Sequence, residues 1–283
     1  MTRVAMSTDD GDRTPGLARR DVLEIRDGVA SPLHDRLAEE VPVAIRCNGE
    51  EVAVMMASPA DLEDFAHGFA LTELGVGIGG LASVDVQALL EGIQLDMHTR
   101  EPLPTRAPDD RARALPGRSG CGICGHRRLE DVIRRPTEVG QGAVIEVGAL
   151  DAALRALEKR QPLNAATGAI HAAGWADRTG GMRLVREDVG RHNALDKLIG
   201  AMGRAGIEAA DGFVLVTSRA SYEMVAKTAV AGIPMLAAMS APTALAVDLS
   251  RRSGMTLVGF TRVGRHVVYS HPHRLEHAMT DQS

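Results

Sequence analysis

The second half of the chain alternates short apolar segments with segments of helical periodicity, and this alternation constrains the fold more than any other feature. The apolar segments are residues 182–185, 213–216, 235–238, 255–260 and 267–269. The helical patterns are residues 151–159, 194–202, 222–230 and 244–252. Such alternation is typical of a largely parallel sheet covered by helices on both faces. We therefore predict an α/β domain over residues 120–275.

The first half of the chain has a different pattern, which predicts a smaller α+β region over residues 21–98. Asn48-Gly49 lies between two apolar segments and is a strong signal for a two-residue hairpin turn. Ser58 followed by Pro59 predicts a helix with Ser58 as its N-cap. The glycines between residues 75 and 80 predict the end of that helix.

Two segments show neither helical periodicity nor the apolar pattern of a strand. Residues 1–20 are polar and are predicted to form a disordered tail. Residues 99–119 contain four prolines interleaved with Arg and Asp, which predicts a linker or surface excursion.

Composition excludes several classes of protein. Aromatic residues make up 2% of the chain and the net charge is -5, which argues against stacking platforms and basic surfaces for nucleic acid. Residues 228–247 carry no charge, but Gly232, Pro234 and Pro242 interrupt them, so a buried strand followed by a helix fits better than a membrane span. The first residues lack the apolar core of a secretory signal. We expect a cytoplasmic protein without a nucleic-acid or membrane partner.

A Cys-x-x-Cys pair lies in the glycine-rich segment Gly120-Cys121-Gly122-Ile123-Cys124-Gly125. With no bulky side chain beside either sulfur, we expect an open loop whose thiolates can meet reactants. Zinc binding, disulfide redox chemistry, sulfur carriage and a structural role are the four interpretations. The lack of a second Cys-x-x-Cys counts against zinc, so we predict no metal site. Cys47 lies in an apolar segment and is predicted to be buried.

The loops after the predicted strands form a second candidate site. Ligands bind at the carboxyl ends of strands in such sheets, where helix N-termini and Arg side chains suit phosphates. The arginines that these loops bring to one rim are Arg191, Arg219, Arg262 and Arg265. The sharper hypothesis is a phosphorylated ligand such as a nucleotide. The simpler alternative is that residues 186–188 form surface ion pairs around ordinary helix caps.

Four motifs occur together in an order that resembles the FdhD family of formate dehydrogenase accessory sulfurtransferases. They are residues 120–125, Thr167-Gly168-Ala169-Ile170-His171, the block Arg186-Glu187-Asp188-Val189-Gly190-Arg191-His192-Asn193-Ala194-Leu195-Asp196-Lys197, and Ser240-Ala241-Pro242-Thr243. The resemblance extends from about Pro42 to Tyr269. Ala169 departs from it, because the family usually has a second glycine there.

The resemblance implies a sulfurtransferase that accepts persulfide sulfur from a cysteine desulfurase. It would pass the sulfur to the bis-guanine-dinucleotide molybdenum (or tungsten) cofactor, which is cargo rather than a permanently bound group, before formate dehydrogenase receives it. Cys121 matches the cysteine that carries the persulfide, and Cys124 matches its partner. The segment that contacts the cofactor matches Phe260, Thr261, Arg262, Val263, Gly264 and Arg265. The implied fold is like that of cytidine deaminase, with three layers, in a homodimer.

From the residues and the resemblance together, we predict that Arg219, His192 and His171 lie near the cofactor segment. His171 is expected to face a space between that segment and the cysteine loop. A zinc deaminase is excluded because Ala172-Ala173 follows His171, where a proton-shuttling Glu is required. The remaining alternative is a chaperone that delivers the cofactor without sulfur transfer and whose cysteine pair senses redox state.

Overall fold

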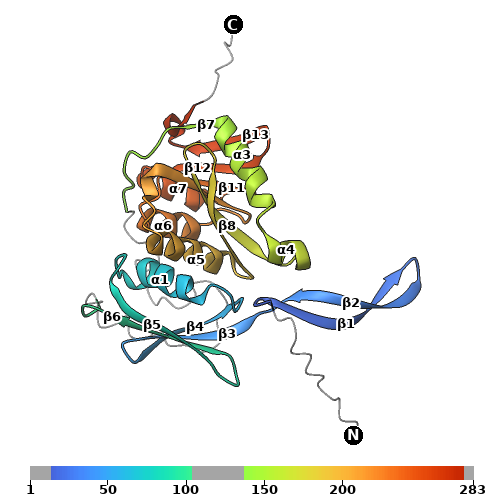
Figure 1. Cartoon of the computed structure of the whole chain (residues 1–283). Coiled ribbons are helices and arrows are strands. Elements are labelled where there is room, and N and C mark those ends of the chain that lie inside the picture. The colour runs from blue at the N-terminus through green and yellow to red at the C-terminus, as the bar shows by residue number, and fades with distance from the viewer. Residues whose placement is uncertain (1–13, 104–136, 277–283) are drawn as a thin grey trace.

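The computed structural model describes residues 14–103 and 137–276 of the 283-residue chain. Figure 1 shows three parts: an upper unit around a six-stranded sheet, a lower unit around a four-stranded sheet, and a two-stranded arm that projects sideways where the two units meet. Among the helices of the described residues, none is both long and apolar enough to cross a membrane.

The upper unit is built on a mixed sheet with the strand order β13-β12-β11-β10-β8-β9. Its strands are β8 (His171–Asp177), β9 (Met182–Asp188), β10 (Gly212–Val216), β11 (Met235–Ala238), β12 (Thr256–Arg262) and β13 (Arg265–Ser270). Strands β10, β11 and β12 are parallel, and the other pairs are antiparallel. The prediction of a largely parallel sheet was therefore wrong. Residues 178–181 and 263–264 are connections too short for a parallel crossover, so they enforce antiparallel pairs.

Helices cover both faces of this sheet, as predicted. One face packs against α5 (Arg191–Arg204), α6 (Tyr222–Val230) and α7 (Ala244–Arg252), and the other packs against α3 (Val147–Glu158). Alternate residues of β10 separate the two cores, since Val214 points to α5–α7 and Phe213 points to α3. The remaining elements of this unit are α4 (Pro162–Thr167), η2 (Ala209–Asp211), η3 (Pro272–Arg274) and the small pair β7 (Ile145–Glu146) and β14 (Leu275–Glu276).

The lower unit is a four-stranded sheet with α1 (Leu62–Leu74) on one face (Figure 1). Its strand order is β4-β3-β6-β5, with β3 (Val41–Cys47), β4 (Glu50–Ala57), β5 (Leu81–Ala88) and β6 (Ile93–Thr99). The predicted β3–β4 hairpin is confirmed, with Asn48 and Gly49 at φ 52° and 85°. Cys47 points into the core beneath α1, as predicted, and burial raises the pKa of its thiol.

Helix α1 begins later than the sequence indicated, and Ser58 is not its N-cap. Asp61, at φ 54°, occupies the N-cap position without a side-chain capping bond. Ser58 is instead buried at the junction of the two units, where its backbone N–H donates to Asp188 Oδ2 at 3.0 Å. Ser58 Oγ also accepts the backbone N–H of Val189 at 3.2 Å, a tertiary contact that a local capping pattern cannot distinguish from a cap.

Two glycines bring α1 and α5 into backbone contact and so join the two units. A Cβ at Gly68 would lie 1.8 Å from the carbonyl oxygen of Asp196, and one at Gly200 would lie 1.9 Å from that of Asp64. Any larger residue at either position would push the helices apart.

The arm consists of β1 (Leu17–Arg26) and β2 (Val29–Ala38), joined by a turn at Asp27 and Gly28. Strand β1 begins at Leu17, inside the segment that was expected to be a disordered tail up to residue 20. Asp27 and Gly28 have φ values of 52° and 80°, which match a two-residue hairpin turn. An Asp-Gly pair is the same kind of hairpin signal as Asn48-Gly49. The sequence therefore contained the signal for the β1–β2 turn, although the hairpin was not predicted from it.

Candidate functional site

One edge of the six-stranded sheet gathers most of the predicted rim. Strands β10, β11 and β12 end there, and His171 begins β8 at the same edge because β8 runs antiparallel to β10. Arg219 follows β10, Arg262 ends β12 and Arg265 begins β13. Neighbouring strands lie about 4.8 Å apart, so the edge from β13 to β8 spans roughly 19 Å.

Backbone hydrogen bonds join the three loops at this edge into one platform. Met239 N–H donates to Val216 O at 2.9 Å, Thr243 N–H to Ala220 O at 3.0 Å, and Phe260 N–H to Ser240 O at 3.1 Å. Loops tied in this way hold their side chains in place before a ligand arrives, which lowers the ordering cost of binding.

Phe260 is the most unusual residue of the rim. Its φ of 50° is rare for an aromatic residue, and its side chain remains partly exposed beside a register shift in β12. The Arg265 guanidinium lies 5.7 Å from the centre of the Phe260 ring. A strained and exposed aromatic residue under a cation is typical of a ligand site rather than of a stabilising core contact.

The turn between β12 and β13 is fastened to α3 by Asp151. The Asp151 carboxylate accepts a hydrogen bond from Gly264 N–H at 3.0 Å and lies 2.9 Å from His266 Nε2. Arg262, at the start of this turn, donates to Thr261 O at 2.8 Å and to Met239 O. Sequence reasoning missed Asp151 and His266, since no local pattern connects a single helical Asp with a turn more than 100 residues later.

The two predicted histidines have different environments. His171 is half-buried, and its pKa is lowered chiefly by burial and then by Arg191 and His192, against an opposing effect of Asp188. His192 is buried, with Nε2 at 2.7 Å from the Glu223 carboxylate. His192 and the buried Thr261 therefore lie beneath the rim, whereas Arg219, Arg262, Val263, Gly264 and Arg265 are exposed on it.

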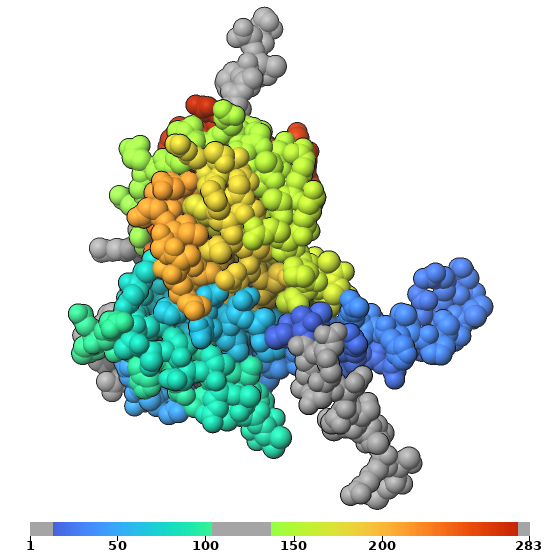
Figure 2. Space-filling model, viewed as in Figure 1, coloured from blue at the N-terminus to red at the C-terminus, as the bar shows by residue number. Residues whose placement is uncertain are grey.

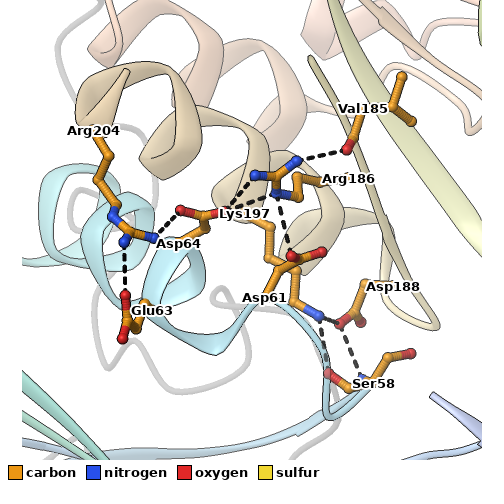
Figure 3. Close-up of polar contacts among 9 residues, drawn as sticks. All are labelled: Ser58, Asp61, Glu63, Asp64, Val185, Arg186, Asp188, Lys197 and Arg204. Atoms are coloured by element: carbon orange, nitrogen blue, oxygen red, sulfur yellow. Dashed lines mark hydrogen bonds and ion pairs between the residues drawn. The ribbon is translucent and has the colours of Figure 1, made fainter. Parts of the chain in front are cut away.

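The block from Arg186 to Lys197 lies at the junction of the two units (Figure 3). Asp188 and Lys197 form a fully buried ion pair at 2.6 Å. Lys197 Nζ also donates to Ser58 O at 2.9 Å, and Asn193 Nδ2 donates to Met56 O at 2.9 Å. The charged end of β9 and the first turns of α5 thus bind the segment that leads from β4 into α1 through hydrogen bonds.

A second set of ion pairs extends this junction. Arg186 lies 2.7 Å from Asp64 in α1, and Arg204 at the end of α5 reaches Asp64 at 2.6 Å and Glu63 at 2.7 Å (Figure 3). Glu187 is buried and accepts the backbone N–H groups of residues 163 and 164 in α4. Arg186 and Asp188 make largely buried ion pairs, the first between the units, and Glu187 is buried against α4 within the upper unit, so the interpretation of residues 186–188 as surface ion pairs was wrong.

A further buried charge cluster links α1, α5 and α6. Lys227 Nζ lies 2.8 Å from Asp196 and 2.7 Å from Glu73, and Thr72 donates to Asp196 at 2.8 Å. Burial alone would lower the pKa of Lys227, but the two carboxylates together raise it above its ordinary value. Lys227 is therefore charged, and its positive charge is compensated inside the protein.

Cys121 and Cys124 lie outside the described residues, so their roles stay predictions. The expected placement of their loop across a space from the rim stays a prediction too. Within residues 14–103 and 137–276, no group of three or more His, Cys, Asp or Glu side chains is arranged to hold a metal ion.

Fold and site together define a mixed α/β protein with an arginine-rich edge and a buried charged signature block. The FdhD/NarQ family model matches residues 38–276, and the chain belongs to this family. It is 53% identical over 266 residues to a sulfur carrier protein FdhD of Xanthomonas campestris pv. campestris (strain B100), covering 93% of each chain. The sulfur carrier protein FdhD of Cupriavidus necator is 51% identical over 247 residues, which cover 86% of this chain and 84% of that one.

The fold also matches a crystal structure of a protein from Desulfotalea psychrophila. The TM-score is 0.75 at 24% sequence identity, and the match covers 93% of this chain and 100% of the other. At this identity the likeness concerns the fold alone. The specific cytidine-deaminase-like arrangement stays a prediction.

Proposed function

We propose that this protein is a sulfur carrier that serves a formate dehydrogenase. The Cys121 thiolate attacks the terminal sulfur of a cysteine persulfide on a desulfurase. An S–S bond forms on Cys121 while the desulfurase cysteine leaves as a thiolate. The names of the relatives and the sequence match at Cys121 support this assignment. Cysteine is suited to the step because its thiolate is both a strong nucleophile and a good leaving group.

A second thiol speeds release of the sulfur. In the proposed step the Cys124 thiolate attacks the inner sulfur of the Cys121 persulfide, which forms a disulfide and expels sulfide toward the metal of the substrate cofactor. A cellular dithiol then reduces the disulfide and restores both thiols. The electrons balance because the two cysteines are oxidised to a disulfide while the outer sulfur of the persulfide leaves as sulfide. Cys124 therefore has the releasing role.

The exposed side chains of the segment from Phe260 to Arg265 are the observation that most supports the proposal. Its exposed ring and two exposed guanidinium groups offer a stacking surface and bidentate phosphate contacts, as a guanine nucleotide requires. The bond from Gly264 to Asp151 fixes the turn before the ligand arrives. The proposed ligand of this rim is the guanine nucleotide portion of the substrate cofactor.

GDP should bind to the full chain, and its affinity should weaken as salt rises, because charged hydrogen bonds of about 1.5–3 kcal/mol each contribute to it. Replacing Arg262 and Arg265 together by Ala should lower the affinity at least tenfold in calorimetry. Arg252→Ala is the matched control, since Arg252 is exposed at the far end of α7. Absence of GDP binding, or equal affinity for the double variant and the control, would refute this placement.

GDP binding should also make the protein take up a proton at slightly acidic pH. Burial lowers the pKa of His171 below that of an ordinary histidine, so its ring is less protonated there than a free imidazole, and a nearby phosphate would raise that pKa. Calorimetry in two buffers of different ionisation enthalpy measures the uptake. Because the terminal phosphate itself titrates near pH 6, the readout is the difference between native protein and His171→Gln. Equal proton uptake by both would place His171 away from the ligand.

A further inference from the structure

A cavity of about 470 Å³ lies where the two units and the root of the arm meet. Figure 2 shows α4 in yellow-green directly above the blue root of the arm, with the lower unit beside them. The cavity is bounded by α4, β9, the segment before α1 and the segment before β1. Its volume is that of a site for a small organic molecule. The apolar side chains that line it include Pro59, Ala60, Pro162, Leu163 and Val185.

Glu187 brings a buried carboxylate to this cavity. It is 6% exposed, and its two oxygens accept the backbone N–H groups of Asn164 and Leu163 at 2.8 and 3.0 Å. Burial raises the pKa of the Glu187 carboxyl group against the opposing effect of these two hydrogen bonds, and the charge of Asp61 raises it further. A carboxylate offers about four lone-pair positions, so each Glu187 oxygen can accept one more hydrogen bond.

The charge of Glu187 has no cationic partner among the residues that the structure describes. Successive residues of a strand point to opposite faces, so Glu187 points to α4 whereas Arg186 points to α1. Arg160 also lines the cavity, but its guanidinium donates to the carbonyl oxygens of Met182 and Arg183 at 2.5 and 3.4 Å. A buried carboxylate without a counter-charge is costly for the folded state. The cavity therefore favours a ligand that brings a positive charge.

Asp61 adds a second carboxylate to the same cavity. Its backbone is left-handed, with φ 54°, and its side chain makes no capping bond to α1. The Asp61 side chain is 42% exposed and lies 3.6 Å from Arg186, so it remains accessible to a ligand. The described residues bring no third His, Cys, Asp or Glu into a metal-binding arrangement with these two carboxylates. Two carboxylates above apolar walls suit an organic cation with an aliphatic stem.

We propose that this cavity binds a guanidinium or alkylammonium group carried on an aliphatic stem. The charged group lies against Glu187 and Asp61, and the stem lies along Pro59, Pro162 and Val185. A guanidinium matches the site best, because its parallel N–H groups can reach both oxygens of one carboxylate. Strands β9 and β13 are opposite edges of the six-stranded sheet, so this cation site lies apart from the rim and can be tested without GDP or sulfur transfer.

Calorimetry of the full chain with L-arginine and L-citrulline tests this cation site. The two ligands have stems of the same length, but citrulline carries a neutral urea group in place of the guanidinium. Arginine should bind at least tenfold more tightly than citrulline, and Glu187→Gln should remove this preference. Ala60→Leu fills the cavity but keeps both carboxylates, and it should weaken arginine binding at least tenfold. Glu208→Gln is the matched control, because Glu208 is exposed just before η2. Circular dichroism should show that all variants remain folded.

The N-acetyl amide of arginine distinguishes two sources of the same cation. It has no charged ends, so it resembles an arginine residue within a protein chain. Tighter binding of free arginine would support a free cationic metabolite as the ligand, and binding of the amide that is at least as tight would support a basic side chain of a partner protein. Equal binding of arginine and citrulline would overturn the proposal. So would the absence of binding by either arginine compound, or an arginine affinity that Glu187→Gln and Ala60→Leu leave unchanged.

Discussion

Cys121→Ala should abolish the support that this protein gives to formate dehydrogenase, while GDP binding stays as in the native protein. The substitution removes the only atom proposed to hold the transferred sulfur, but it leaves the rim from Phe260 to Arg265 intact. Formate dehydrogenase activity should therefore fall to the background of a strain that lacks the protein. After incubation with a cysteine desulfurase and cysteine, mass spectrometry should find one added sulfur atom on native Cys121 and none on the variant.

The other two cysteines serve as controls. Cys124→Ala should accept sulfur but release it slowly, so activity should fall only in part. Cys47 is buried beneath α1 with a raised thiol pKa, so it should gain no sulfur in the native protein. Normal activity of Cys121→Ala would refute sulfur carriage and favour a cofactor-delivery chaperone with a redox-sensing pair. Equal and complete loss in both variants would contradict the separate roles of Cys121 and Cys124.

Lys197→Met should destabilise the protein by about 3–5 kcal/mol, because it leaves the Asp188 carboxylate buried without its counter-charge. It also removes the donor to Ser58 O, which ties the β4–α1 segment to α5. Lys227→Met should have an effect of similar size, since Lys227 compensates Asp196 and Glu73. Urea unfolding of the full chain measures both changes.

Arg26→Ala is the control for these stability measurements. Its ion pair with Glu24 is exposed on the arm, so the expected change is within about 1 kcal/mol. If Lys197→Met cost no more than this control, the buried block would not hold the two units together. Lys197→Gln should recover part of the loss, because its amide still donates hydrogen bonds.

Local sequence patterns were sufficient for the elements whose signals are short-range. The predicted helices at residues 222–230 and 244–252 coincide with α6 and α7, and the predicted strand at 235–238 coincides with β11. Apolar periodicity and helix caps depend on neighbours within a few residues, so the sequence contains them directly. Strand β8 escaped prediction because its Ala172-Ala173-Gly174 segment has small residues, and its burial comes from Trp175 and from the strands beside it.

The sequence also determined which residues belong to the rim. Arg219 follows β10 and Arg262 ends β12, which run parallel, and Arg265 begins β13 after a two-residue turn, so the three arginines meet at one edge of the sheet. The bond from Asp151 to Gly264 that fixes the rim was decided only by the tertiary structure, because it joins α3 to a turn far along the chain.

The block from Arg186 to Lys197 shows most clearly what the sequence determines and what only the tertiary structure decides. The sequence singled it out, but only the folded structure decided that Asp188 and Lys197 are buried rather than solvated. Their environment is set by Ser58, which lies 130 residues before Asp188 in the chain. The identity of a side chain determines its charge and its hydrogen-bonding groups. Whether water or a buried partner satisfies them depends on which distant segments pack around it, and α1 reaches α5 only because Gly68 and Gly200 leave room for the two backbones to touch.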